Sequence, residues 1–180
     1  MQQNLPATLE EFLAWEESQE ERHEFVDGAV SLFPGGTLRH AVIAANLIGA
    51  LRLHLTSASR VATSDARVVG DNRSRYADVL VTRDPRDRPE ATFVMYPFLI
   101  IEVLSDSSAA TDRGDKADEY RRIETLEEYV LVDSRKRWTQ TFARNGGDWV
   151  ISVPRRDGAL HLVSAGCDIP FDTVYAGTEL

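Results

Sequence analysis

The spacing of hydrophobic positions changes along the chain, and three stretches have helical spacing. Leu9 and Phe12 accompany a sequence with capping-box spacing at residues 8–11, which predicts a first amphipathic helix. From about 40 to 55, leucines and isoleucines recur every three or four positions among alanines and predict a second helix that packs on a sheet. A third, more polar helix is expected at about 112–123.

Short apolar runs bounded by turn residues predict the strands. Two short strands are expected around an Asp27-Gly28 turn, because this pair favours tight hairpins. Further strands are predicted at about 60–69, 76–82, 97–104, 127–133, 137–143, 148–153 and 159–163. The succession strand, helix, strand from Glu102 to Leu131 has the length of a crossover unit.

These elements predict an α/β protein. We expect a mixed β-sheet flanked by helices, with a helix pair on one face and C-terminal β-hairpins. No repeat, low-complexity segment or Pro/Gly/Ser linker divides the 180 residues, so a single domain spanning 1–180 is expected.

Composition narrows the class of protein. The chain is 43% hydrophobic and 27% charged, which is ordinary for a soluble globular protein. No apolar run approaches the roughly 20 residues of a membrane span, and the first four residues do not begin a signal segment. We therefore expect a cytoplasmic protein without membrane contact. The single cysteine, Cys167, cannot form an internal disulfide, and we interpret it as a small core thiol.

The net charge of −9 argues against a protein that holds nucleic acid by bulk electrostatics, since phosphate contacts need Lys and Arg. Carboxylates around a metal site would add to this negative count, so the charge weakens a DNA hypothesis without removing it. Basic residues do cluster locally: Arg60, Arg67, Arg73 and Arg75, then Arg135, Lys136 and Arg137. We interpret both clusters as solvated loop charge.

Two carboxylates interrupt runs that read as buried strands. Glu102 lies within the apolar sequence 98–104, and Asp78 lies within the run 76–81. An unpaired buried charge costs several kcal/mol, so a partner must bind Glu102. Because residues two apart share one face of a strand, neighbouring strands could direct both carboxylates into one pocket. Such oxygen ligands suit Mg²⁺, with Mn²⁺ as the alternative.

A lysine completes the chemistry. Lys116 follows Glu102 by 14 positions in the predicted third helix (116 − 102), and Tyr120 lies one turn later on the same helix face, with Asp112 one turn earlier. Two inward carboxylates and an ammonium group are the parts of a metal-dependent phosphodiesterase site, in which the metal activates water and screens the charge of the phosphodiester.

Six ordered segments, each weak alone, carry a family resemblance. They are Glu-Arg-His-Glu-Phe-Val-Asp-Gly (21–28), Arg39-His40, Tyr76-Ala77-Asp78-Val79, Ile101-Glu102-Val103-Leu104-Ser105, Asp112-Arg113-Gly114-Asp115-Lys116 and Glu128-Tyr129-Val130-Leu131-Val132-Asp133. Together they resemble the Uma-type restriction endonuclease family of the PD-(D/E)XK nuclease superfamily, from about residue 8 to 153.

The resemblance implies a set of site residues. Asp78 corresponds to the first acid, Glu102 to the second, and Glu24 to a helix-proximal glutamate that often joins the site, while Lys116 stands for a lysine moved from the strand to the following helix. The resemblance also implies a restriction-endonuclease-like core, in which a mixed β-sheet is flanked by helices. We expect Asp78, Glu102, the Val103 carbonyl and Glu24 to hold Mg²⁺ and the substrate to be nucleic acid, with DNA as the expected form. Two departures are Ala77 in place of proline and Leu104 in place of the usual lysine.

Other interpretations stay open. Glu102 could form a purely structural salt bridge, His40 could be incidental, and Tyr120 could be an ordinary core residue. The chain could also be a catalytically inactive dimeric member that acts as a binding or scaffold protein, or a carboxylate-pair glycosidase. A homodimer is expected from apolar side chains on the C-terminal strands, namely Trp138, Phe142, Trp149 and Ile151.

Overall fold

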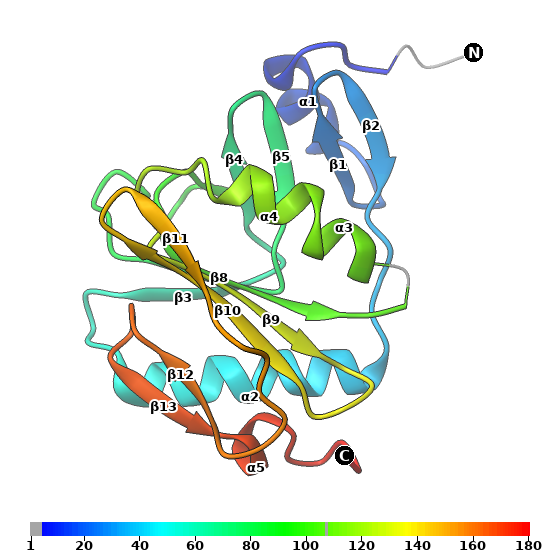
Figure 1. Cartoon of the computed structure of the whole chain (residues 1–180). Coiled ribbons are helices and arrows are strands. Elements are labelled where there is room, and N and C mark those ends of the chain that lie inside the picture. Colours follow the sequence, from blue (N-terminus) through cyan, green and yellow to red (C-terminus); the bar gives the residue numbers. More distant parts are fainter. Residues whose placement is uncertain (1–4, 107) are drawn as a thin grey trace.

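Six strands form the central sheet of the computed structural model, which describes residues 5–106 and 108–180 (Figure 1). Their spatial order is β11 (Asp148–Ile151), β10 (Thr139–Asn145), β9 (Glu128–Asp133), β8 (Pro97–Leu104), β6 (Val79–Thr82) and β3 (Arg60–Thr63). β8 and β9 run parallel, and the other neighbours in this sheet run antiparallel. The predicted mixed sheet is therefore confirmed. Residues 1–4, to which the expected lack of a signal segment refers, lie outside the described residues.

Helices cover both faces of this sheet. The crossover from β8 to β9 runs through α3 (Ala109–Arg113) and α4 (Asp115–Tyr120), which pack on one face, while α2 (Leu38–His54) packs on the other (Figure 1). The helix pair expected on one face corresponds to α3 and α4, and α2 covers the opposite face. Ile100 points to the α4 face of β8 and Ile101 to the α2 face, so each face is apolar and each must be buried.

A second sheet lies beside the first and carries the N-terminal elements. Its order is β2 (Ala29–Leu32), β1 (His23–Val26), β5 (Arg73–Tyr76), β4 (Arg67–Gly70) and β7 (Phe93–Val94). α1 (Leu9–Glu16) begins at the predicted capping box, in which Thr8 and Glu11 bond each other's backbone N–H groups. Phe12 of α1 stacks on Phe25 of β1 at 5.2 Å between ring centroids, which anchors the helix to this sheet.

Two predicted strands are divided in the structure. The segment 60–69 forms β3 and β4, which belong to different sheets, because Thr63 and Asp65 close a turn between them. The segment 76–82 divides as well: Tyr76 ends β5, and Asp78 lies in the short link before β6. Asp78 is therefore not a strand residue, although it still precedes a neighbour of β8.

The predicted third helix is also interrupted. Gly114, with φ −103° and ψ −97°, separates α3 from α4. The break turns one expected helix of residues 112–123 into two short ones, which leaves Asp112 on α3 and Lys116 on α4. Both side chains nevertheless face the sheet, since both are buried.

Two C-terminal hairpins are present, in line with the expected C-terminal β-hairpins. β10 pairs with β11, and both of these strands were predicted. β12 (Ala159–Leu162) pairs with β13 (Cys167–Pro170), a strand that sequence analysis did not predict, and α5 (Phe171–Val174) follows. Cys167 is buried against the α2 side of the core, in line with a structural thiol. In the described part of the chain, no helix is long and apolar enough to span a membrane.

The argument for a homodimer loses most of its basis. Trp138 and Phe142 are buried in the core on the α4 side, and Trp149 packs against the same core. Of the four residues, Ile151 is the one that is largely exposed, at 52%. Dimerisation therefore stays a prediction, as do the single domain and the cytoplasmic location.

Candidate active site

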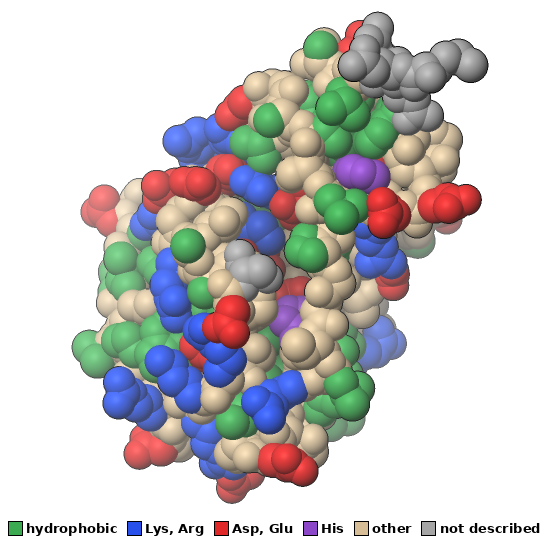
Figure 2. Space-filling model, turned by 90° about the vertical axis from the view of Figure 1, so that its right-hand side faces the viewer, with side chains coloured by type: hydrophobic (Ala, Val, Ile, Leu, Met, Phe, Trp, Pro, Cys, Tyr) green, Lys and Arg blue, Asp and Glu red, His purple; other side chains and the backbone are tan. Residues whose placement is uncertain are grey.

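A cavity of about 510 Å³ opens between the two sheets at the end of β8. Its wall is built from β1, the link before β6, the end of β8, the start of α2 and the helices α3 and α4. The charged and titratable side chains that line it are Arg22, Glu24, His40, Arg75, Asp78, Glu102, Asp112 and Lys116. Figure 2 views this side of the molecule, and Lys and Arg side chains gather on the lower half of the face.

Glu102 is a deeply buried carboxylate of the cavity wall, with 2% of its surface exposed. Lys116 Nζ donates to Glu102 Oε1 at 3.1 Å, and the Tyr120 hydroxyl donates to the same oxygen at 3.2 Å. No described residue donates a hydrogen bond to Glu102 Oε2. The partner that the sequence required is therefore Lys116 with Tyr120, and one carboxylate oxygen is left for a further ligand.

Lys116 lies at the centre of three carboxylates. Besides Glu102, its Nζ is 3.3 Å from Asp112 Oδ1 and 3.7 Å from Glu24 Oε1, and it donates to the Tyr76 carbonyl at 3.2 Å. Burial by itself lowers the pKa of Lys116, but the surrounding carboxylates outweigh it and raise the pKa above its ordinary value. Lys116 is thus a fixed positive charge across the physiological pH range.

Glu24 is held by the second sheet. Arg75 Nη1 donates to Glu24 Oε2 at 2.9 Å, and the Tyr76 N–H donates to Glu24 Oε1 at 3.0 Å. The same guanidinium makes two 2.9–3.0 Å hydrogen bonds to Glu119 of α4. Arg75 therefore ties the N-terminal sheet to α4 and neutralises part of the charge on Glu24.

Asp78 is held by backbone and by a histidine. The Val103 N–H donates to Asp78 Oδ2 at 2.7 Å, and His40 Nε2 lies 3.0 Å from the same oxygen. Within the described residues, Asp78 Oδ1 accepts no hydrogen bond. Because the N–H and C=O of one strand residue point to the same side, the Val103 carbonyl faces the same edge of β8 as Asp78.

Burial and crowding of like charges govern protonation here. Burial raises the pKa of Glu102 well above its usual range, and although Lys116 opposes this, Asp78 and Asp112 add to it. Burial likewise raises the pKa of Asp112. For His40 burial lowers the pKa, but the hydrogen bond and charge of Asp78 outweigh burial, so the pKa is raised overall. The raised pKa values of these three groups show that the cavity stabilises bound protons, and a bound cation would be stabilised for the same reason.

The donor atoms fit a hard divalent cation. Four carboxylates, those of Glu24, Asp78, Glu102 and Asp112, face the fixed charges of Arg75 and Lys116, which leaves an excess of negative charge. In the described ranges, no three His, Cys, Asp or Glu side chains already form a metal-ligand group. Mg²⁺ takes one or two protein carboxylates and completes its shell with waters and substrate oxygens, so the free oxygens of Asp78 and Glu102 meet this requirement.

The structure brings together the residues expected from the sequence. Asp78, Glu102, Lys116 and Glu24 all line the cavity, and Val103 contacts Asp78 through its backbone. His40, which the sequence left as an incidental residue, contacts Asp78. Tyr120 is a core residue that also donates to Glu102, so the core interpretation was incomplete.

Two site residues were not chosen from the sequence. Asp112 had a usable signal, because it precedes Lys116 by one helical turn. Arg75 had none, since it was one of several arginines in an expected loop cluster and its contact with Glu24 spans 51 positions.

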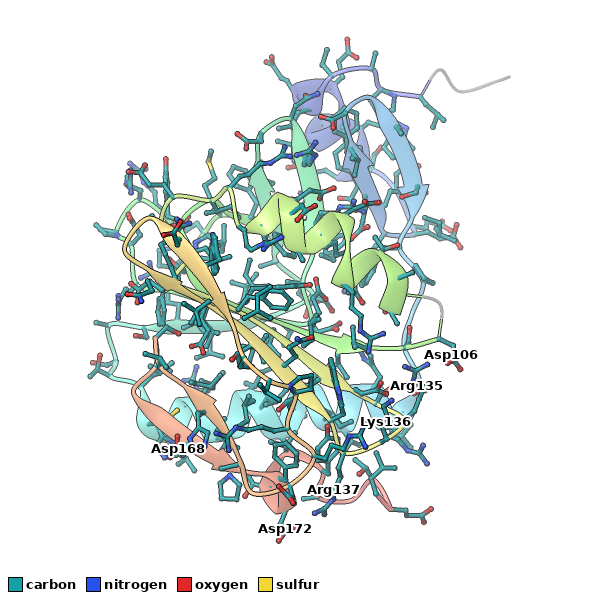
Figure 3. The ribbon with its side chains drawn as sticks, viewed as in Figure 1. Asp106, Arg135, Lys136, Arg137, Asp168 and Asp172 are labelled. Carbon is teal, nitrogen blue, oxygen red and sulfur yellow. The ribbon has the colours of Figure 1, made fainter. Side chains whose placement is uncertain are left out.

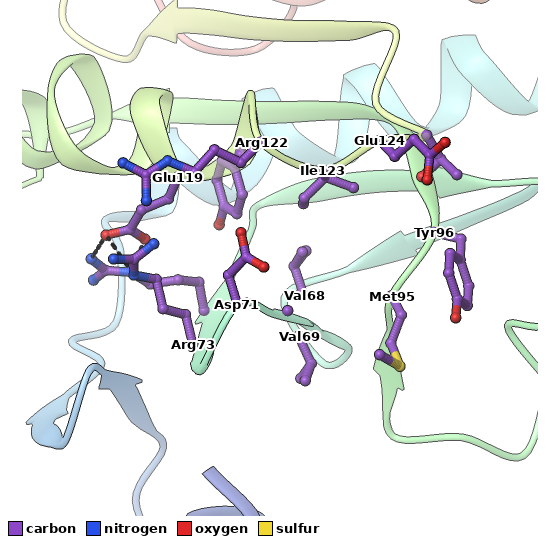
Figure 4. Close-up of a pocket in the computed structure, with 14 residues that line it drawn as sticks. Val68, Val69, Asp71, Arg73, Met95, Tyr96, Glu119, Arg122, Ile123 and Glu124 are labelled. Atoms are coloured by element: carbon purple, nitrogen blue, oxygen red, sulfur yellow. Dashed lines mark hydrogen bonds and ion pairs between the residues drawn. The ribbon is translucent and has the colours of Figure 1, made fainter. Parts of the chain in front are cut away.

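A second cavity, of about 310 Å³, lies on the other side of the Arg75–Glu119 pair (Figure 4). Val68, Met95 and Ile123 contribute to its largely apolar wall. Its carboxylates are Asp71, Glu119 and Glu124, and Glu119 is already paired with Arg75. This cavity lacks the combination of Asp78, Glu102 and Lys116, so we assign the chemistry to the larger one.

Comparison with known proteins identifies the family of this chain. The sequence model of the Uma2 family, which is described as "Putative restriction endonuclease", matches residues 9–167. The chain belongs to the Uma2 family. The match covers every site residue named above and both sheets, and it ends at the start of β13.

Relatives of this Uma2 protein include two from Synechocystis sp. (strain PCC 6803). "Uncharacterized protein slr1290" is 38% identical over 172 residues, covering 93% of this chain and 90% of the relative. "Uncharacterized protein sll1609" is 34% identical over 131 residues, covering 70% of this chain and 74% of the relative. Neither name describes an activity.

A solved structure shares the fold. The crystal structure of "a putative nuclease belonging to DUF820" from Anabaena variabilis superimposes with a TM-score of 0.78, covering 96% of this chain and 99% of the other. The two sequences are 17% identical, so the likeness shows the fold alone. The Uma2 chain therefore has a nuclease-like fold with mixed sheets flanked by helices.

Proposed function

We propose that this Uma2 protein is a Mg²⁺-dependent nuclease that hydrolyses phosphodiester bonds of nucleic acid, with DNA as the first substrate to test. The observation that carries the proposal is the pairing of two free carboxylate oxygens, on Asp78 and Glu102, with the buried ammonium of Lys116 in one open cavity. Membership of a family described as restriction endonucleases supports the same reaction class.

Asp78, Glu102 and the Val103 carbonyl would hold the cation. When bound, Mg²⁺ or Mn²⁺ would act as a Lewis acid: it would lower the pKa of a water molecule and screen the negative charge of the phosphodiester. The chain's own contribution is to fix these oxygens: the Val103 N–H and His40 fix Asp78, while Lys116 and Tyr120 fix Glu102. Such fixed donors do not need to reorganise during the reaction.

Lys116 would orient the attacking water and stabilise negative charge on the phosphate. Its raised pKa keeps the ammonium protonated, so it donates hydrogen bonds and does not act as a general base. Glu24 lies 3.7 Å from Lys116 Nζ and 2.9 Å from Arg75 Nη1, and it would hold the lysine in place and help position the water or a second cation.

Cationic side chains near the cavity support a nucleic-acid substrate. Arg39 neighbours His40 at the start of α2 and is exposed, and Lys136 is exposed in the turn after β9. Arg135 bonds Asp133 and Asp106, which places this turn beside the loop that follows β8 (Figure 3). We propose that these residues contact the phosphate backbone, since such contacts supply most non-specific affinity.

One observation favours the alternative of a catalytically inactive binding or scaffold protein. Lys116 is bonded directly to Glu102, and Arg75 is bonded to Glu24, so protein cations already compensate part of the charge. Leu104, at the position of the usual lysine, is buried in the core and takes no part in the cavity. An inactive member would keep this network for stability alone.

Calorimetric titration with Mg²⁺ and Mn²⁺, followed by cleavage of single- and double-stranded DNA and RNA, tests the proposal. Wild type is compared with Asp78→Asn and with Asp157→Asn, a control at an exposed turn outside the cavity. We expect binding and metal-dependent cleavage in wild type and Asp157→Asn, and neither in Asp78→Asn. Binding without cleavage of any substrate would support the scaffold alternative, and absence of binding in wild type would refute the metal site.

A further inference from the structure

The imidazole of His40 is fixed at the mouth of the cavity. His40 lies in the first turn of α2, where Thr37 caps the helix and accepts the His40 N–H at 3.3 Å. Its side chain is 17% exposed, and Nε2 lies 3.0 Å from Asp78 Oδ2. An ionised carboxylate only accepts hydrogen bonds, so Nε2 carries the proton that is donated to Asp78.

Gly36 lies close to the imidazole ring of His40. A Cβ atom added to Gly36 would lie 2.7 Å from His40 Nδ1 and 2.9 Å from Cγ, closer than real Cβ contacts allow. The absence of a side chain at Gly36 is therefore what gives the imidazole room in its observed place. The neighbouring Gly35 has no such constraint, because a Cβ there would meet nothing within 4 Å.

The two oxygens of Asp78 are thereby distinguished. Oδ2 accepts from the Val103 N–H at 2.7 Å and from His40 at 3.0 Å, while Oδ1 accepts no hydrogen bond from a described residue. Two donors on one oxygen prevent the carboxylate from rotating, since rotation would break both bonds. Oδ1 is then the oxygen available to a ligand in the cavity.

We propose that His40, which has room for its ring because Gly36 has no side chain, is a positioning residue that fixes Asp78 so that its Oδ1 is presented to a divalent cation. This inference rests on the proposed metal site and assigns a role to the loop before α2. His40 acts through Asp78 and not on the substrate. Hydrogen-bond partners of metal-ligating carboxylates typically change metal affinity by about 10- to 100-fold when removed, and we expect an effect of this size.

Two substitutions separate the hydrogen bond from the volume of the ring. His40→Phe keeps an aromatic ring of similar size but cannot donate to Asp78, so its Mn²⁺ affinity falls by about 10- to 100-fold. His40→Gln places an amide N–H near the position of Nε2 and restores most of the affinity. A role in packing alone predicts the reverse order, with the phenylalanine variant closer to wild type.

Two glycine substitutions test the same idea without touching the histidine. Gly36→Ala forces the imidazole away from its place, so Mn²⁺ affinity falls in the same direction as in His40→Phe. Gly35→Ala is the matched control, because Gly35 also lines the cavity but its Cβ has free space. We expect the Gly35→Ala affinity to equal that of wild type.

Mn²⁺ titration by calorimetry is the measurement, with thermal unfolding of each variant to show that it is folded. Lower affinity in His40→Phe and Gly36→Ala, with recovery in His40→Gln, supports the inference. Equal affinity in all variants overturns it while leaving the proposed metal site intact, and tighter binding in His40→Phe overturns it by showing that His40 competes with the cation. If wild type binds no Mn²⁺, both the proposed function and this inference fall.

Discussion

Glu102 and Glu128 are buried glutamates on the neighbouring parallel strands β8 and β9, with 2% and 1% of their surfaces exposed. They point to opposite faces of the central sheet. Glu102 shares its face with Ile100 and α4, whereas Glu128 alternates with Tyr129 and bonds the loop after β12. Burial raises the pKa of both carboxyl groups.

Their partners differ in kind. Glu102 is bonded to the ammonium of Lys116 and lies in a cavity with three further carboxylates. Glu128 accepts from the N–H and hydroxyl of Ser164, at 3.0 and 2.7 Å, and its other oxygen is buried without a hydrogen bond from the described chain. Burial and a raised pKa are therefore shared by a candidate site and a structural position, and what distinguishes the site is its charged partners and open space.

The largest expected difference between the two glutamates is in the unfolding free energy that is lost when the hydrogen-bond partner of each is removed. Lys116→Met leaves Glu102 and Asp112 buried without their cation and should cost about 3–5 kcal/mol of unfolding free energy. Ser164→Ala removes the hydroxyl donor to Glu128 but keeps the backbone N–H donor, and it should cost about 1–3 kcal/mol. Urea unfolding measures both.

Repeating the urea unfolding of both variants with Mg²⁺ distinguishes the two positions further. Added Mg²⁺ should raise the unfolding free energy of Lys116→Met more than that of Ser164→Ala, because a divalent cation can replace the missing ammonium charge. Equal losses in the two variants, or an equal response to Mg²⁺, would show that the two glutamates are equivalent structural residues.

Activity should separate the same two positions. Glu102→Gln removes a proposed ligand and should lower metal-dependent cleavage by at least about 100-fold. Glu128→Gln keeps the shape of its side chain on the far face of β9, so its cleavage rate should equal that of wild type. Initial rates on a labelled duplex at saturating Mg²⁺ provide the measurement. A comparable loss in both variants would mean that Glu102 acts through stability.

Stability at different pH values tests Glu128 by itself. Its pKa in the folded protein is raised above the ordinary 4.5, so the folded state binds a proton more tightly than the unfolded state. The stabilising contribution is complete below pH 4.5 and is lost as the pH rises through the folded-state pKa. Glu128→Gln should therefore gain unfolding free energy relative to wild type between acidic pH and pH 8. A constant difference in urea unfolding would contradict the raised pKa.

The smallest expected effect is on the salt dependence of nucleic-acid binding, compared between exposed cations at opposite ends of the central sheet. Lys136→Ala, in the turn after β9, should reduce the slope of log affinity against log salt by about 1 if Lys136 contacts a phosphate. Arg88→Ala is the control, since Arg88 is exposed in the loop between β6 and β7. Binding to a short duplex is measured by fluorescence anisotropy from low to moderate salt. Equal slopes would remove Lys136 from the proposed surface.

Local patterns predicted much of the candidate site. Glu102 could be selected because apolar residues surround it, and Lys116 because its helical face also carries Tyr120. Sequence analysis did not identify Glu128 as a buried acid. It follows Glu127 at the start of a strand, and two adjacent charged residues usually indicate a solvent-exposed position. Its burial depends on Ser164, which lies 36 positions away.

Sequence alone determined the types of most elements and the capping box of α1, because these follow from spacing along a strand or helix. It also predicted the mixed sheet and the selection of Asp78, Glu102 and Lys116, which line one cavity. Tertiary structure decided the rest. It placed α2 and α4 on opposite faces, divided 60–69 between two sheets, and brought Arg75 and His40 to the carboxylates. Contacts between residues 38 or more positions apart depend on how the sheets pack, and no periodicity records that packing.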